Sequence, residues 1–298
     1  MELSGVLIVD KEKGYTSFDV VAKLRGILGI RKIGHTGTLD PDATGVLVCC
    51  IGKATKLIPL MEGADKTYRA TMRLGLVTDT QDIWGTELSE SSYDDITHEM
   101  IKTELESVIG DQMQVPPMYS AKKVGGKKLY ELAREGREIE RKPVPITVHS
   151  VSDVSIDIPE VTFTVKVSKG TYIRTLIHDM GTALGCGACM SELRRITAGK
   201  YDIGQAHTLN EIESLMKAGD IHKALLPIDE AFEGIERLTI KPSFEKLLRN
   251  GNLLTDNSFE NSYEAAEGEE VLVYMPEGTF AAVYTFNNKS FKVKKMFL

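Results

Sequence analysis

The segment 34–45, GHTGTLDPDATG, constrains how this chain can fold more than any other stretch. Before it, apolar residues recur at helical spacing until Gly29, and after it residues 46–51 form a continuous apolar run of strand length. The glycines let backbone approach backbone or ligand closely, and Pro41 keeps Asp40 out of helical geometry. We therefore expect a stiffened loop that presents Asp40 between a helix and a buried strand.

Strand and helix patterns follow one another along the rest of the chain, which indicates a fold that combines both. Thr16 or Ser17 is placed to cap the first helix, and Thr208 with Glu211 has capping-box spacing before a later one. Apolar runs or alternation predict further strands at residues 5–9, 68–74 and 161–167.

Two domains are expected, because a chain of 298 residues can bury a core in each of them. The first covers residues 1–235. Beyond about Glu236 the pattern changes to a short helix and several strands. This gives a small β-rich unit over residues 236–298, with strands at 271–274, 280–286 and 291–297.

The excess of acidic over basic residues is concentrated in one segment of the chain. The formal net charge is −7, which speaks against a nucleic-acid partner only if charge is treated as a single number. Residues 79–106 hold nine acids and one lysine, a net of −8, whereas residues 119–146 hold eight bases and four acids, a net of +4. A charge run is usually a solvated face, so this segregation permits nucleic-acid binding without establishing it.

The sequence predicts neither export nor a membrane anchor. The early apolar run at residues 6–9 is far shorter than a signal-peptide core or a membrane span. Cys49 and Cys50 are adjacent in an apolar run, and a chain of this size needs no disulfide support, so reduced thiols are expected. A structural zinc site usually needs two cysteine pairs, and Cys186 with Cys189 has no suitably spaced second pair. We expect a cytoplasmic protein without a bound metal.

Asp40, taken alone, has two interpretations. Aspartate in a Gly-rich loop most often makes a side-chain hydrogen bond within a turn. A carboxylate on a stiffened loop is also suited to act as a nucleophile or as a base. The local residues leave both interpretations open.

The same loop closely resembles the signature loop of the TruB family of tRNA pseudouridine-55 synthases. Other blocks resemble that family's motifs and occur in the family's order, although Glu12 stands where proline is common and Cys189 where histidine is frequent. These blocks are GVL with DK at 5–11, KTYR at 66–69, TDTQD at 78–82, PPMYSAKK at 116–123, GKKLY at 126–130, SKGTYIR at 168–174, and LGCGA with LRR at 184–195.

The resemblance implies an isomerase that converts uridine to pseudouridine. This reaction breaks the N1–C1′ bond, turns the uracil and joins C5 to C1′ without redox change or hydrolysis, so no cofactor is expected. The family's aspartate is the nucleophile, which assigns that role to Asp40, while attack on C1′ and removal of a 2′ proton both stay open. The resemblance pairs Arg174 with Asp40 and stacks Tyr68 on the uracil, where its hydroxyl could relay a proton.

Further residues are assigned to the RNA by the resemblance. Tyr172 and Leu193 would line the uracil pocket, and His35 would contact the RNA where the target base is flipped out. Residues 119–146 correspond to an RNA-gripping insertion, and residues 236–298 to a PUA-like RNA-binding domain. Phosphates would be held by four cations: Lys11, Lys56, Arg194 and Arg195.

The expected substrate is the T stem-loop of tRNA, modified at uridine 55 by a monomer that needs no guide RNA. The implied fold is α+β, with a mixed or antiparallel sheet and flanking helices in the catalytic domain. Two alternatives stay open, the catalytic subunit of a guide-RNA-dependent pseudouridine synthase and a tRNA-folding chaperone with little catalysis. A protein that only binds RNA has no need of Asp40, Tyr68 and Arg174 together.

Overall fold

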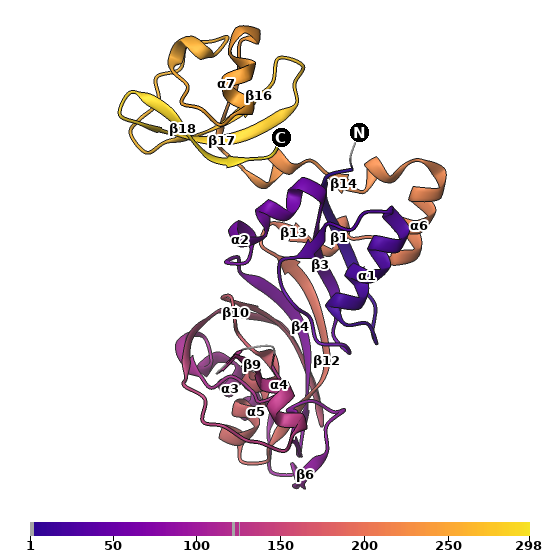
Figure 1. Cartoon of the computed structure of the whole chain (residues 1–298). Helices are drawn as coiled ribbons and strands as arrows, with labels where there is room; N and C mark the ends of the chain where they lie inside the picture. Colours follow the sequence, from indigo (N-terminus) through magenta and orange to yellow (C-terminus); the bar gives the residue numbers. More distant parts are fainter. Residues whose placement is uncertain (1–2, 121–122, 125) are drawn as a thin grey trace.

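The computed structural model describes residues 3–120, 123–124 and 126–298. Within them, ten strands form one mixed sheet, whose main path runs β14-β1-β3-β12-β4-β11-β10-β7, while β2 pairs with β3 and β13 with β12 (Figure 1). The α+β fold with a mixed sheet is therefore confirmed. The strands are β1 (Gly5–Lys11), β2 (Ile33–His35), β3 (Thr44–Ile51), β4 (Lys66–Leu74), β7 (Gly110–Gln114), β10 (Val144–Asp157), β11 (Glu160–Val167), β12 (Ala188–Ala198), β13 (Tyr201–Asp202) and β14 (Leu225–Leu226).

Strands β3 and β12 run parallel, whereas the other neighbours along the main path are antiparallel. Arg194 lies opposite Thr44, and Arg195 lies opposite Gly45. The parallel pairing therefore places the two arginines of β12 beside the end of the loop that carries Asp40. Sequence patterns did not predict β12, because charged residues interrupt its alternation.

Two pairs of helices cover different parts of the sheet. Helices α1 (Ser17–Leu28) and α6 (Leu209–Ala218) contact each other over β1 and β3, and α3 (His98–Ser107) and α5 (Ile173–Leu184) share a core with β4, β11 and β12. The predicted helix ends are confirmed. Thr16 caps α1, Gly29 ends it in a left-handed conformation, and Thr208 with Glu211 forms a capping box at α6. No helix in the described ranges combines the length and apolar character needed to cross a membrane.

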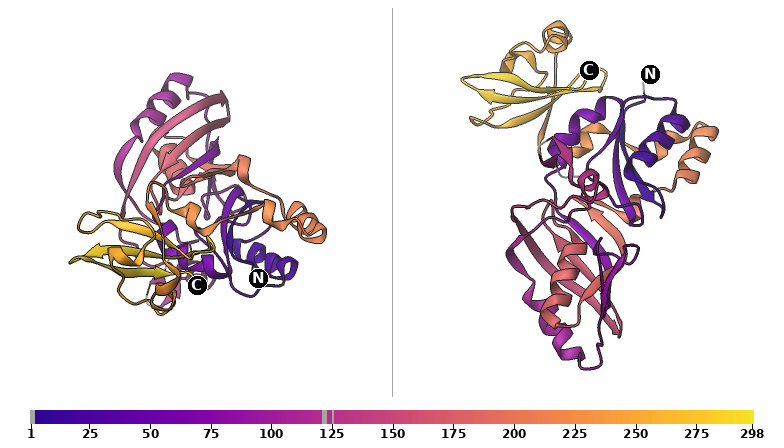
Figure 2. Two further views of the ribbon diagram at one scale, coloured as in Figure 1. Left: turned by 90° about the horizontal axis from the view of Figure 1, so that it is seen from above. Right: turned by 60° about the horizontal axis from the view of Figure 1, so that its bottom comes forward.

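A separate four-stranded sheet, in the order β15-β16-β17-β18, forms the C-terminal unit. Figure 2 shows this C-terminal sheet beside one end of the larger sheet, the end near β1 and the short helix α2 (Ile58–Met61). Leu272, Val283 and Phe297 share a buried hydrophobic cluster with Val6 and Val48, so apolar packing joins the two sheets. The predicted short helix and three strands are confirmed as α7 (Glu245–Arg249), β16 (Glu270–Tyr274), β17 (Phe280–Asn287) and β18 (Ser290–Met296), and the sheet gains a strand that was not predicted, β15 (Glu236–Thr239).

The basic segment 119–146 contains short elements before the sheet resumes. They are β8 (Lys123–Val124), β9 (Lys127–Lys128) and α4 (Leu129–Arg134). The long strand β10 starts at Val144, so the last residues of the predicted insertion belong to the sheet. Lys122 lies outside the described residues. A further hairpin of β5 (Leu76–Thr78) and β6 (Glu87–Glu90) lies in the acidic segment 79–106 and just before it.

Candidate active site

The loop that carries Asp40 leaves β2 and rejoins the sheet at β3, beside the parallel strand β12. Gly45 has a φ of +98°, a conformation that L side chains rarely adopt. A Cβ at this position would lie 2.2 Å from the carbonyl oxygen of Arg195. Glycine is therefore required where the loop rejoins the sheet, because the obstacle is the backbone of the neighbouring strand.

The backbone of the loop is anchored on both sides of Asp40. The Leu39 N–H donates to Oγ of Ser17 at 2.8 Å, and the same hydroxyl donates to the Leu39 carbonyl at 3.2 Å. The Pro41 carbonyl accepts from Nζ of Lys11 at 2.8 Å. Asp40 lies between these two anchored residues, so its backbone position is fixed by contacts to the end of β1 and the start of α1.

Two cations that were expected to hold phosphates are buried beneath this loop. Lys11 is fully buried, and burial lowers the pKa of its ammonium to about 8. Arg195 is buried as well. Its Nε donates to the Val46 carbonyl at 2.6 Å, and its Nη2 donates to the Gly37 carbonyl at 3.1 Å. Both side chains support the backbone of the loop, and a phosphate contact from either stays a prediction.

Asp40 and Arg174 form the ion pair that the resemblance implies, with Nε of Arg174 2.9 Å from Oδ2 of Asp40. The arginine side chain is 5% exposed at the start of α5, whereas the aspartate side chain is 41% exposed. Other guanidinium N–H groups donate to the carbonyls of Thr80 and Tyr119, both at 2.9 Å. The carboxylate is thus accessible while its counter-ion is held in place by backbone carbonyls.

A second carboxylate, which the sequence analysis did not single out, contacts the same guanidinium. Oδ2 of Asp82 lies 3.4 Å from Nη1 of Arg174, and its Oδ1 accepts from the Thr80 hydroxyl at 2.6 Å. Burial raises the pKa of Asp82, although the Thr80 hydrogen bond and the charge of Arg174 oppose this rise. The one available signal in the sequence was the position of Asp82 in the TDTQD block.

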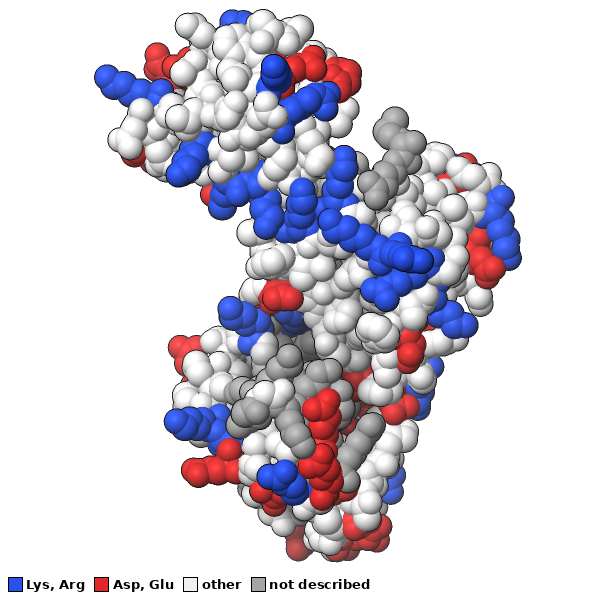
Figure 3. All heavy atoms as spheres, in the orientation of Figure 1, with Lys and Arg blue, Asp and Glu red and all other residues white. Residues whose placement is uncertain are grey.

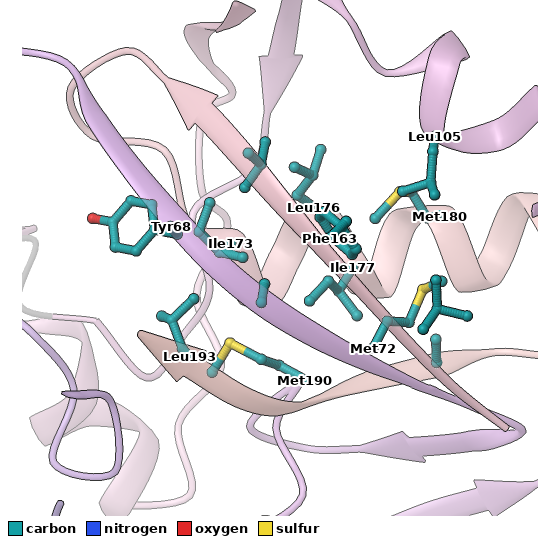
Figure 4. Close-up of a cluster of buried hydrophobic side chains, with 14 of the residues drawn as sticks. Tyr68, Met72, Leu105, Phe163, Ile173, Leu176, Ile177, Met180, Met190 and Leu193 are labelled. Atoms are coloured by element: carbon teal, nitrogen blue, oxygen red, sulfur yellow. The ribbon is translucent and has the colours of Figure 1, made fainter. Parts of the chain in front are cut away.

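A cavity of about 370 Å³ lies beside the Asp40–Arg174 pair. Figure 4 shows Tyr68 near Leu193 at the edge of a hydrophobic cluster, with its hydroxyl pointing away from the other labelled side chains. The cavity therefore combines an aromatic ring, an aliphatic side chain and a carboxylate, as a planar base with its ribose would require. The expected site residues that line it are His35, Asp40, Tyr68, Tyr172, Arg174, Leu193 and Arg195. The expected site residues that do not are Lys11, Lys56 and Arg194.

A buried glutamine holds Tyr172, the residue that precedes α5. Oε1 of Gln114 accepts from the Tyr172 N–H at 2.8 Å, and its Nε2 donates to the Tyr172 carbonyl at 3.0 Å. The side chain of Gln114 thus makes both hydrogen bonds that a neighbouring strand would make. This contact fixes the chain just before Arg174. Nothing in the local sequence distinguishes Gln114 from other polar strand residues.

His35 lies at the edge of the cavity, at the end of β2. Burial, and next the charge of Arg195, lower the pKa of its imidazole, so the neutral ring is favoured near neutral pH. Its Nδ1 is buried and has no hydrogen-bond partner among the described residues. A neutral ring with an unused polar atom is suited to contact a displaced base.

Arg194 and Lys56 lie away from the cavity. Nη2 of Arg194 is 2.8 Å from Oδ2 of Asp10. Lys56, in the 3-10 helix η1 (Gly52–Leu57), donates to the carbonyl of Met296 in the C-terminal unit at 2.6 Å. Burial lowers the pKa of Lys56, and so do the charges of the nearby lysines 32, 53 and 295. Figure 3 shows Lys and Arg side chains in a row across the face between the two sheets.

Comparison with known proteins agrees with this geometry. Residues 25–173 match a family model described as the N-terminal domain of the TruB family of pseudouridylate synthases, and residues 174–233 match a tRNA pseudouridylate synthase B C-terminal domain. Over 296 residues, the chain is 42% identical to tRNA pseudouridine synthase B of Clostridium novyi (strain NT), covering 99% of this chain and 100% of that protein. The protein of the same name from Syntrophotalea carbinolica is 42% identical over 94% of this chain and 91% of its own.

Solved structures show a similar fold. One is a Cbf5-Nop10-Gar1 complex, with a TM-score of 0.71 and 27% identity, covering 99% of this chain and 85% of the matched chain. Another is an H/ACA RNP bound to a substrate RNA containing 2′-deoxyuridine, with a TM-score of 0.70 and 26% identity over the same shares of the two chains. The sequence matches, the fold and the arrangement around Asp40 together show that the chain belongs to the TruB family of pseudouridylate synthases.

Proposed function

We propose that this protein isomerises uridine 55 in the T loop of tRNA to pseudouridine and does so without a guide RNA. The observation that carries the proposal is the Asp40–Arg174 pair at the wall of a cavity that also contains Tyr68 and Leu193. Relatives that match almost the whole chain carry the name tRNA pseudouridine synthase B, which supports tRNA as the substrate class.

Asp40 supplies the anion that the reaction needs. Its carboxylate either adds to C1′ as the N1–C1′ bond breaks, or removes the 2′ proton as the uracil leaves. After the uracil has turned, C5 bonds to C1′. In the first route the bond between Asp40 and C1′ breaks at this step, and in the second the proton held by Asp40 returns to C2′. The proton on C5 is then lost and N1 gains a proton. Atoms balance without an oxidant or water. In both routes Arg174 stays beside the carboxylate throughout the reaction, because its other N–H groups are bonded to backbone carbonyls.

The target base reaches Asp40 only after leaving its stack in the RNA loop. Flipping a base costs a few kcal/mol, and stacking on an aromatic side chain returns about 1–3 kcal/mol. Tyr68 supplies the ring for the uracil, and Leu193 supplies the apolar side of the same cavity. The neutral imidazole of His35 contacts the RNA at the place the uridine has left.

Binding of a polyanion by an acidic protein depends on local charge. Lys56 lies near the lysines at positions 32, 53 and 295. Lys53 and Lys56 belong to η1, Lys32 precedes β2, and Lys295 lies on β18 of the C-terminal sheet. Such a patch attracts phosphates although the formal net charge is −7, because counterion release is governed by the surface that the RNA touches. We infer that the stem of the substrate RNA binds to the patch formed by these four lysines.

The guide-dependent alternative is less well supported. The solved neighbours named after Cbf5 complexes are 26–27% identical to this chain, whereas the relative named tRNA pseudouridine synthase B is 42% identical over its whole length. The chain therefore resembles a tRNA enzyme more closely than the subunit of a guide-RNA particle. The choice is tested by whether the protein acts alone.

The experiment incubates an unmodified tRNA transcript with the pure full chain and maps pseudouridine by mass spectrometry. Conversion at uridine 55 is expected without added RNA or protein. Asp40→Asn should abolish product while tRNA binding stays within about tenfold, because the amide keeps size and polarity but lacks the anion. Asp157→Asn, an exposed aspartate at the end of β10, is the matched control and should stay active. Conversion that needs a guide RNA would favour the alternative, and an active Asp40→Asn variant would overturn the mechanism.

A further inference from the structure

A second cavity, of about 780 Å³, adjoins the proposed uracil cavity. The two share His35, Asp40 and Arg174, so the Asp40 loop forms a wall common to both. The rest of its lining includes the start of α1, residues between β5 and β6, Tyr119 and Met190. The isomerisation of a single uridine makes no use of this space.

Two exposed aromatic side chains line the second cavity. Phe18 is 65% exposed and Trp84 is 42% exposed. Phe18 lies in the first turn of α1, and Trp84 lies in the connection between β5 and β6, so separate segments bring the two rings to one place. Large aromatic side chains usually contribute to a core, and a pair of them exposed beside an active-site loop indicates a binding surface.

Cations flank both rings. Nζ of Lys13 lies 4.7 Å from the centroid of the Trp84 ring, and Cζ of Arg25 lies 5.8 Å from that of Phe18. Surfaces that bind single-stranded nucleic acid combine aromatic rings for the bases with positive charge for the backbone. Both features occur here, because the rings line the second cavity and the cations lie beside the rings. The cavity also continues directly from the site proposed for the target uridine.

We propose that Phe18 and Trp84 form a stacking platform for a nucleobase adjacent to the target uridine in the RNA. This inference rests on the proposed function, because the occupant is the neighbour of the base at Asp40. The carboxylates of Asp40 and Asp82 line the same cavity and repel a phosphate, so the base enters while the backbone stays near the cations. Extruding the target unstacks its neighbour, and the platform restores a stacking partner to that neighbour.

The single tryptophan of the chain is Trp84, so its emission reports on the platform directly. The full-length protein is titrated with an RNA stem-loop that contains the target uridine. Two matched RNAs lack the base on the 5′ or the 3′ side of the target. The intact RNA should quench the emission at saturation, and one of the two abasic RNAs should lose most of that quenching. Equal quenching by all three RNAs, or none by the intact RNA, would overturn the platform.

Variants give an independent readout. Trp84→Leu and Phe18→Leu keep an apolar side chain but remove the ring, and each should raise KM for the intact RNA about tenfold while kcat changes less than about twofold. With the abasic RNA that does not quench, Trp84→Leu and the parent should have KM values within about twofold, because the stacked base is absent from both. Trp84→Phe should restore most of the lost affinity.

Leu88→Ala is the matched control, because Leu88 is 66% exposed on β6 and lines neither cavity. Its KM should equal that of the parent. An equal rise in KM on intact and abasic RNAs would show a general effect of the substitution and overturn the platform. If the parent converts uridine but neither readout depends on the missing base, the platform is wrong and the proposed function stands. If the parent converts no uridine in any RNA, both fail.

Discussion

Nε of Arg174 lies 2.9 Å from Oδ2 of Asp40, and the two side chains differ sharply in exposure, 5% against 41%. The pair is therefore unlike a surface salt bridge, in which both partners move in solvent and the net stabilisation is small. Backbone carbonyls of Thr80 and Tyr119 fix the guanidinium before substrate arrives. The site is preorganised, so little reorganisation is needed when the charge on Asp40 changes during the reaction.

Arg174→Lys tests this arrangement, because lysine keeps the charge but cannot make the same set of directed hydrogen bonds. We expect kcat to fall by about 100-fold or more, with tRNA affinity within about threefold. Arg73→Lys is the control, since Arg73 forms a half-exposed pair with Glu160 at 3.6 Å. Single-turnover kinetics on a tRNA transcript measure the rate of uridine conversion by each variant. A kcat for Arg174→Lys within a few-fold of the parent would show that charge alone is sufficient.

Ser17→Ala tests the anchor of the catalytic loop. The hydroxyl of Ser17 is buried and makes two hydrogen bonds to the backbone of Leu39, so its loss leaves backbone groups unsatisfied and should lower the free energy of unfolding by about 1–3 kcal/mol. A loosened Asp40 should also lower kcat more than it raises KM. Ser214→Ala removes an exposed hydroxyl that bonds to its own helix, and it should change neither quantity. An unchanged kcat for Ser17→Ala would show that the hydrogen bonds of Ser17 to Leu39 are not needed for catalysis.

The sequence predicted those parts of the fold in which apolar periodicity decides the structure. Strands β3, β4 and β11 and helix α1 are of this kind, and their buried residues follow the expected spacing. Strand β10 was missed because most of its residues are at least partly exposed and show no clean alternation. Strand β12 was missed because Arg194 and Arg195 interrupt its apolar pattern, although Arg195 is buried.

The candidate site shows the same limit. Asp40 and Arg174 were found through motifs, but the contacts of Asp82 with Arg174 join residues 92 positions apart. No local pattern reports such a contact. The burial of Lys11 was equally hidden, because lysine is rarely buried and general rules predict a surface position. These residues became visible as supports of the loop only when tertiary packing brought the segments together.

Tyr68→Phe separates stacking from proton transfer. The ring of Tyr68 is buried at the cavity wall, and phenylalanine keeps that ring while removing the hydroxyl. We expect tRNA binding within about twofold and single-turnover conversion slowed about tenfold or more, if the hydroxyl relays a proton. Tyr201→Phe removes a buried hydroxyl from the cluster that joins the two sheets, where it lines neither cavity, and it should not slow conversion. An unchanged rate for Tyr68→Phe would leave Tyr68 with a stacking role.

Phe297→Ala tests how firmly the C-terminal sheet is attached. Phe297 is 2% exposed, packs 5.2 Å from the Phe280 ring and belongs to the cluster that includes Val6 and Val48 of the larger sheet. Removing a buried phenyl ring should cost about 3–5 kcal/mol in the free energy of unfolding. Urea unfolding measures this cost, with Leu253→Ala as an exposed control. A loss under about 1 kcal/mol would show that the two sheets are only loosely joined.

Lys11 makes stability depend on pH in a defined window. Burial lowers its pKa from the ordinary 10.5 to about 8, so between these values the unfolded chain holds a proton that the folded chain has released. The contribution of Lys11 to the free energy of unfolding therefore rises with pH through this window and is lowest below it.

Lys11→Met removes the titrating group. Urea unfolding of the parent and the variant at several pH values from about 7 to about 10 should give a difference, parent minus variant, that increases with pH. The control Lys217→Met removes a side chain that is 73% exposed. Its free energy of unfolding should change with pH in the same way as that of the parent. Parallel curves for Lys11→Met as well would mean that the ammonium keeps its ordinary pKa, and that the Pro41 carbonyl is held by a hydrated rather than a buried lysine.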